Sequence, residues 1–127
     1  MDKIVAKIVA LGVPGLVLLL AVSISGYAGA AAITTALAAF GGPFGMIGGI
    51  GVFGLSALIL NGISEYGFER IFTNVLLELE KKGHTKEEII RKIENYPISK
   101  SLKLKLKEKF RGNTKNTNND YGIDPFK

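Results

Sequence analysis

Hydrophobic positions fill the first half of the chain almost without interruption, whereas apolar and polar positions alternate in the second half. From Ile8 to Ser64 no residue carries a charge. A bilayer core of ~30 Å is crossed by about 20 helical residues, but this stretch drawn as one helix would be roughly 85 Å long. The pattern therefore predicts a segment that folds back on itself, inside a membrane or as an unusually apolar core, and we favour the membrane.

Glycine and proline divide the apolar stretch into three segments, residues 4–25, 27–40 and 43–63. The first contains Pro14, which would kink a helix but is tolerated in membrane helices. The second is rich in alanine and too short to span a bilayer comfortably. The third follows the Gly41-Gly42-Pro43 break, and we expect it to end at Asn61-Gly62.

The second half carries apolar residues at helical spacing. Residues 65–82 place six of them at i, i+3 and i+4 positions, namely Phe68, Ile71, Phe72, Val75, Leu76 and Leu79. Gly83 is suited to end this helix, and Thr85-Lys86-Glu87-Glu88 is a capping-box pattern that opens another. The apolar face of that next helix comprises Ile89, Ile90, Ile93 and Tyr96. Pro97 is expected to stop it.

Residues 98–111 fit two patterns. Leu102, Leu104 and Leu106 alternate with lysines as in a strand, whereas Ile98, Leu102, Leu106 and Phe110 follow the four-residue steps of a helix. We predict a helix, because no second strand candidate exists and an isolated strand is not stable in water. Residues 112–127 are rich in Asn and poor in apolar residues, so we expect a disordered tail.

These elements predict an all-α protein in three parts: a membrane-embedded helical hairpin with a Gly-rich second helix (1–64), a basic amphipathic helical module (65–111) and the tail (112–127). Lysines and arginines flank both ends of the apolar block, and such flanks stay in the cytoplasm. Two spans with both termini cytoplasmic satisfy this rule, whereas three would export the basic tail. The Lys/Ile/Asn-rich tail is typical of an AT-rich bacterial genome, so we expect an integral protein of a bacterial inner membrane.

A cleaved signal peptide is the alternative for the N-terminus. Two lysines precede the apolar run, and Ala28-Gly29-Ala30 resembles a small-residue cleavage site. Against this, the run is long for a signal peptide and is interrupted by glycine and proline. Cleavage would leave residues 31–127 as the mature chain, which keeps the span at 43–63.

Glycines recur at short intervals around the third segment. Two tandem GxxxG motifs and an adjacent glycine face comprise Gly41, Gly45, Gly49, Gly48, Gly51 and Gly54. Small residues on one helical face let two backbones approach closely, which is the main packing device in lipid. The partner is either a second copy of the chain, which predicts a homo-oligomer and a pore, or residues 8–25 of the same chain.

Basic residues gather toward the end of the helical module, as Lys100, Lys103, Lys105, Lys107, Lys109 and Arg111, opposed there only by Glu108. A basic amphipathic segment beside a span favours contact with anionic lipid headgroups, at ~1 kcal/mol per residue. The same residues could dock an acidic cytosolic protein, or only keep a helix face solvated. Nucleic acid is disfavoured, because no aromatic residues are interleaved with the lysines.

Residue types suited to catalysis are scarce. The chain has no cysteine, which excludes thiol nucleophiles and disulfides, and its single histidine, His84, lies in a turn where we expect solvent contact. Gly49-Ile50-Gly51-Val52-Phe53-Gly54 matches GxGxxG, but the dinucleotide fingerprint needs a preceding strand that is not found here. We therefore predict a protein that is not an enzyme and binds no cofactor or metal.

The stretch from Gly26 to Leu58 (GYAGAAAITTALAAFGGPFGMIGGIGVFGLSAL) resembles the Gly/Ala-rich membrane core of the small interferon-inducible proteins of mitochondria and endoplasmic reticulum. The layout of two spans and a basic tail is similar to that of phage holins and small membrane-acting toxins. Both resemblances imply a membrane-perturbing effector, and neither identifies an individual residue. The alternative function is a passive anchor whose basic helices dock a cytosolic partner or anionic lipid.

Overall fold

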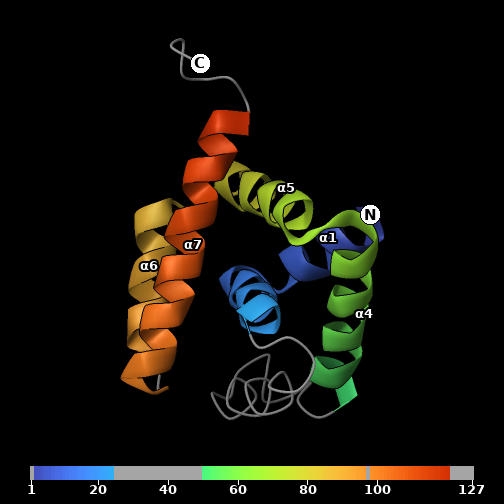
Figure 1. Cartoon of the computed structure of the whole chain (residues 1–127), viewed down its shortest axis with the longest axis horizontal. Helices are drawn as coiled ribbons and strands as arrows, with labels where there is room; N and C mark the ends of the chain where they lie inside the picture. Colours follow the sequence, from blue (N-terminus) through green and yellow to red (C-terminus); the bar gives the residue numbers. More distant parts are fainter. Residues whose placement is uncertain (1, 25–49, 97, 121–127) are drawn as a thin grey trace.

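The computed structural model describes residues 2–24, 50–96 and 98–120 (Figure 1). Within these ranges the chain forms six helices and no strand, which confirms the all-α prediction for the described part of the chain. The helices are α1 (Asp2–Ala10), an unlabelled helix (Val13–Ile24), α4 (Ile50–Tyr66), α5 (Phe68–Lys81), α6 (Lys86–Asn95) and α7 (Lys100–Asp120). The predicted alanine-rich segment and the Gly41-Gly42-Pro43 break lie outside the described residues.

The first apolar segment forms two helices and not the single kinked helix that we expected at Pro14. α1 and the Val13–Ile24 helix meet at a bend of 120°. Gly12, between them, has a φ of 74°, a backbone conformation that L side chains seldom adopt. Pro14 falls in the first turn of the new helix, where its missing N–H costs nothing. The break is therefore made by the glycine, and the proline favours the start of the next helix.

The Val13–Ile24 helix lies at the centre of the molecule, drawn in blue in Figure 1. Its residues from Leu16 to Ala21 have no exposed surface at all, as expected for a helix that is apolar on every side. The other helices complete this core with one buried face each. The buried faces of α5, α6 and α7 contribute nine residues to the core, namely Ile71, Phe72, Val75, Leu76, Leu79, Ile89, Ile93, Leu106 and Phe110. The apolar faces predicted for the second half are thus confirmed.

Helix α4 does not end where we expected, because it continues through Asn61-Gly62 to Tyr66. A Cβ atom placed on Gly62 would lie 2.7 Å from Cδ1 of Ile4 and 3.0 Å from Cδ1 of Ile71. The glycine therefore lets α1 and α5 pack closely on α4. The chain then turns at Gly67, whose φ is 89°, so that α5 begins at Phe68.

The turn between α5 and α6 has the predicted caps. Gly83 adopts a φ of 99° just after α5, and the His84 N–H donates to the Leu79 carbonyl at 3.0 Å, which closes the helix end. The Oγ1 atom of Thr85 accepts a hydrogen bond from the Glu88 N–H at 3.1 Å at the start of α6. The predicted helix end at Gly83 and the predicted start at Thr85 are confirmed. Of the capping box the structure shows the bond from the Glu88 N–H to Thr85, while the Glu88 carboxylate pairs with His84 and Lys92.

Helix α7 is longer than predicted. It begins after Ser99, whose Oγ accepts from the Leu102 N–H at 3.1 Å, and it extends to Asp120. Residues 112–120, which we expected in a disordered tail, therefore continue the helix. The side chains of Asn113 and Thr114 donate to carbonyls of the preceding turn, at 2.8 Å and 2.9 Å, and so add to the bonding of the helix. Residues 121–127 lie outside the described residues.

Candidate functional site

The strongest membrane-related feature is the pair formed by α1 and the Val13–Ile24 helix. No single helix among the described residues is long and apolar enough to cross a bilayer, but these two helices taken together have the length and composition of a span. Helix α4, the next described helix along the chain, carries no charge before Glu65. In the described ranges the apolar half thus contains one broken span candidate and one helix whose only charge is Glu65, near its end.

Of the six glycines predicted to form a helix-packing face, only Gly51 and Gly54 lie within the described residues, both in α4. Four of them lie outside the described residues: Gly41, Gly45, Gly48 and Gly49. Gly51 is in the first turn of α4, and Gly54, one turn later, is exposed with open space around it. Gly54 therefore does not make the close approach to residues 8–25 that was one of our two alternatives.

Close backbone approach occurs instead at Gly15 and Gly62, neither of which belongs to the predicted glycine set. A Cβ atom on Gly15 would penetrate the carbonyl oxygen of Ile8 and lie 3.1 Å from Cβ of Leu11. Gly62 plays the same part between α1, α4 and α5, as described above. The available signal was the pair of glycines, Gly12 and Gly15, on either side of Pro14, where we expected only a kink at the proline.

The predicted basic residues of α7 fall into two groups. Lys107 and Lys109 have partners within the chain: Lys107 Nζ lies 2.9 Å from Glu94 Oε2 of α6, and Lys109 Nζ lies 4.8 Å from the centre of the Phe68 ring. The Lys107 side chain is only 19% exposed, so its charge chiefly joins α7 to α6. The remaining four, Lys100, Lys103, Lys105 and Arg111, are exposed or half-buried.

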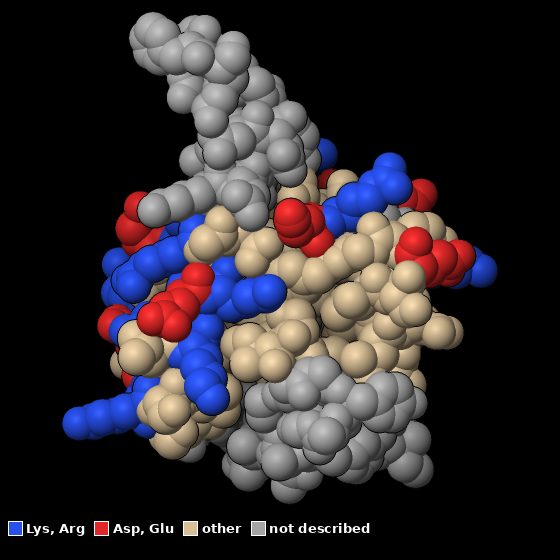
Figure 2. Space-filling view, in the orientation of Figure 1, with Lys and Arg blue, Asp and Glu red and all other residues tan. Residues whose placement is uncertain are grey.

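Glu94 is the acidic counterpart of this basic surface. The hydrogen bond from Lys107 and the charge of Lys107 hold the pKa of Glu94 below its ordinary value, against a small opposing effect of burial. Arg111 and Lys103 add further lowering from the same side. Figure 2 shows Lys and Arg side chains gathered over α6 and α7, with a few acidic side chains among them. The surface therefore stays predominantly positive.

Leu104 is the one large hydrophobic residue that is exposed among the described residues, at 53%. On a helix, residues three, four and seven positions apart share a face, so Leu104 lies among Lys100, Lys107 and Arg111. The opposite face of α7 is buried in the core. The exposed face of α7 thus combines one apolar side chain with several basic ones, the two kinds of group that contact an anionic lipid surface. We call Leu104, Lys100, Lys105 and Arg111 the basic crest.

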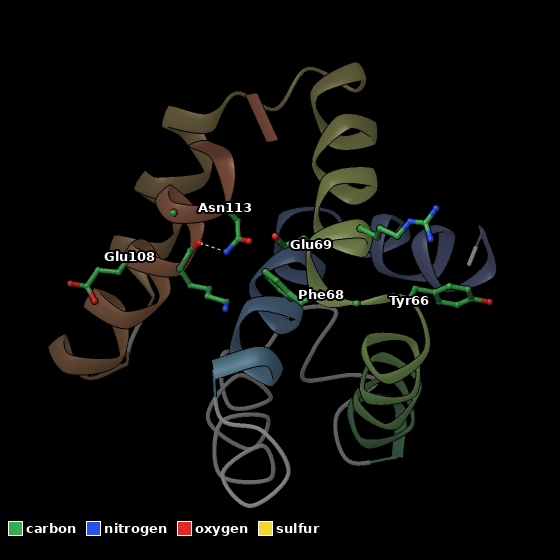
Figure 3. A pocket seen from close by; sticks show the side chains of 9 residues that line it. Tyr66, Phe68, Glu69, Glu108 and Asn113 are labelled. Carbon is green, nitrogen blue, oxygen red and sulfur yellow. Dashed lines mark hydrogen bonds between the residues drawn. The ribbon is translucent and has the colours of Figure 1, made fainter. Parts of the chain in front are cut away.

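An open cavity of about 610 Å³ lies where the turn between α4 and α5 meets α7 (Figure 3). Asn113 faces Phe68 and Glu69 across it, while Tyr66 and Glu108 point away. Its lining includes both acidic and basic side chains, Lys109 already stacks on Phe68, and Asn113 donates to the Lys109 carbonyl. The cavity has no single charge sign, and we assign no ligand to it.

His84 is half-buried and paired, and not the solvated loop residue that we expected. Its Nδ1 lies 3.1 Å from Glu88 Oε2, and Lys92 Nζ lies 3.3 Å from the same oxygen. The hydrogen bond from His84, followed by that from Lys92, lowers the pKa of Glu88. The pairing of His84 with Glu88 therefore links the turn before α6 to the first turn of that helix.

No protein-family model, no curated protein and no solved structure matches this chain.

Proposed function

We propose that this protein inserts into a lipid bilayer and perturbs it as a homo-oligomer. The observation that carries the proposal is the broken span candidate at residues 2–24, within which Leu16 to Ala21 are fully buried. An apolar helix must be covered in water, because exposing it is costly, whereas lipid tails can take the place of that cover. The fold thus holds apolar surface that a bilayer can accept.

The second span of the proposed hairpin is the segment 43–63, with both chain ends in the cytoplasm. Its described part, in α4, has no charge before Glu65 and leaves Gly54 open on its surface. An open glycine face on an apolar helix suits close contact with the same helix of another copy. Oligomers joined through the Gly-rich face would then perturb or permeabilise the bilayer.

The basic crest supplies the surface attraction. Lys100 and Arg111 lie on the face of α7 that carries Leu104, away from the core, and Lys105 is exposed on the flank beside it. Three basic residues near an anionic surface strengthen binding on the order of 100-fold. Lys107 and Lys109 have partners within the chain and contribute less to this attraction.

Release of a trapped dye tests the proposal. Full-length protein is added to vesicles of phosphatidylcholine alone or with one-third phosphatidylglycerol. We expect release from both kinds of vesicle, at much lower protein concentration when phosphatidylglycerol is present, because the basic crest concentrates the protein there. Complete absence of release at any protein concentration would contradict membrane perturbation.

The second candidate function is a passive anchor, and the basic crest is the observation that favours it. In that case the apolar half only holds the protein at the membrane, while α6 and α7 dock an acidic cytosolic protein or anionic lipid. Protein that stays with the vesicles through an alkaline wash but never releases dye would favour the anchor.

A further inference from the structure

The bend at Leu11-Gly12 separates two helices that together would form one span. Asp2–Ala10 and Val13–Ile24 meet at 120°, although only two residues lie between them. Drawn as one straight helix, residues 2–24 would be about 34 Å long, close to the ~30 Å of a bilayer core. We propose that Leu11-Gly12 is a hinge, and that α1 and the Val13–Ile24 helix straighten into one transmembrane helix in the bilayer. This inference rests on the proposed membrane insertion.

The charges near the N-terminus are compatible with this span. Residues 8–24 are uncharged and, at about 25 Å of helix, lie within the accepted range for a short span. Lys7 comes one residue before them, where its long side chain can reach the headgroups while its backbone stays at the edge of the apolar layer. Asp2 and Lys3 then lie in the headgroup region.

Straightening the hinge exchanges hydrogen bonds without losing many. In the bent form the N–H groups of Leu11, Gly12 and Gly15 each donate to a carbonyl three residues earlier, at 2.8–3.1 Å. In a continuous helix the same groups donate four residues back. Leu16 already donates to Gly12 at 3.4 Å, as it would in the straight form. In the continuous helix the Ala10 carbonyl has no donor, because Pro14 lacks an N–H, and the proline ring also crowds that carbonyl. The continuous helix therefore keeps a slight kink there, of the kind that membrane helices tolerate.

Two glycines favour the bent form over the straight one. Gly12 has a φ of 74°, and a Cβ atom on Gly15 would penetrate the Ile8 carbonyl oxygen. In a straight helix both positions accept alanine, which is a better helix former than glycine. Gly12→Ala therefore disfavours the bend and favours the continuous helix, and the two effects shift the equilibrium on the order of 50-fold. Gly15→Ala acts in the same direction through its clash.

Gly67→Ala provides the matched control. Gly67 also has a positive φ, 89°, and a Cβ atom placed on it would meet nothing within 4 Å, but it lies between α4 and α5 and outside the proposed span. The substitution causes the same kind of backbone strain without affecting the hinge. A general loss of stability would thus appear in both variants, whereas a shift of the hinge would appear only in Gly12→Ala and Gly15→Ala.

Spin labels placed on both sides of the hinge measure its state. The chain has no cysteine, so Ala6→Cys and Ser23→Cys give one label pair in the full-length protein. The helix rise places the two backbones about 14 Å apart at a 120° bend and about 25 Å apart in a straight helix. In phosphatidylglycerol-containing vesicles we expect the long distance. In detergent micelles, Gly12→Ala should raise the ratio of long to short distances on the order of 50-fold, and Gly67→Ala should leave it unchanged.

An alkaline wash of the same vesicles separates two kinds of failure. If the labelled protein washes off, the proposed membrane insertion fails, and the hinge fails with it. If the protein stays but keeps the short distance, the hinge alone is overturned and residues 2–24 remain bent in the membrane. An unchanged distance ratio in both Gly12→Ala and Gly15→Ala would also overturn it.

Discussion

Two glycines of α4, Gly54 and Gly62, lie in opposite surroundings, so substitutions at them test the packing of the fold and the assembly of the chain separately. Gly62 is buried against Ile4 and Ile71, and even a single added carbon would lie 2.7 Å and 3.0 Å from their Cδ1 atoms. Gly54 is exposed and has open space around it. Leucine at the two positions therefore makes the same chemical change in a crowded and in an open place.

The magnitudes follow from these surroundings. Overpacking a core costs ~1–3 kcal/mol, and four added carbons at Gly62 belong at the upper end, whereas replacing glycine in a helix returns ~1 kcal/mol. Gly62→Leu should thus destabilise the fold by ~2 kcal/mol and lower the melting temperature by about 10 °C. At Gly54 the leucine meets no crowding and only its higher helix propensity counts, so we expect Gly54→Leu to raise the melting temperature by about 5 °C.

Circular dichroism melts of the full-length protein in one mild detergent measure this difference, and chemical cross-linking of the same samples measures the oligomer. If the face around Gly54 joins copies of the chain, Gly54→Leu should disperse the oligomer and suppress dye release while leaving the helix content unchanged. Equal melting shifts in the two variants would refute the packing argument. A Gly54→Leu variant that still cross-links and still releases dye would refute the assembly face.

Three further predictions concern the helical module. Lys107 holds the pKa of Glu94 below its ordinary value of 4.5, so this pair contributes stability above about pH 4.5 that is lost as the pH falls through the lower pKa of the folded state. Glu94→Gln should remove that part of the acid-induced loss of stability in melts recorded over a pH series, and an unchanged pH profile would contradict the prediction. Thr85→Ala should destabilise the protein by ~1 kcal/mol in denaturant unfolding, with Thr85→Ser close to wild type, and equal losses in both would argue against the cap. Leu104→Asn should leave the melting temperature within about 2 °C and weaken co-sedimentation with phosphatidylglycerol vesicles, whereas unchanged co-sedimentation would remove Leu104 from the membrane-binding surface.

Features that depend on local sequence could be predicted well. The buried faces of α5, α6 and α7 follow from apolar spacing, and the caps at Gly83 and Thr85 follow from residues next to one another in the chain. The choice of a helix for residues 98–111 rested on the lack of a second strand, and α7 confirms it. Such signals need no knowledge of distant contacts.

Features that depend on distant partners could not be predicted. Lys107 and Lys109 looked like free basic residues, because their partners Glu94 and Phe68 are on other helices. The break at Gly12 looked like a proline kink, because only the folded chain shows Gly15 against the Ile8 carbonyl. The sequence could indicate that residues 4–25 bend, but not that they form two separate helices.

Stable insertion of the apolar half into a membrane is the central claim, and alkaline carbonate extraction tests it most directly. The full-length protein is produced in bacterial cells, and the membrane fraction is washed with carbonate at high pH. The uncharged stretch from Ile8 to Ser64 predicts that the protein stays with the membranes and is released only by detergent. Recovery in the carbonate wash as a stable monomer that needs no detergent would contradict the account.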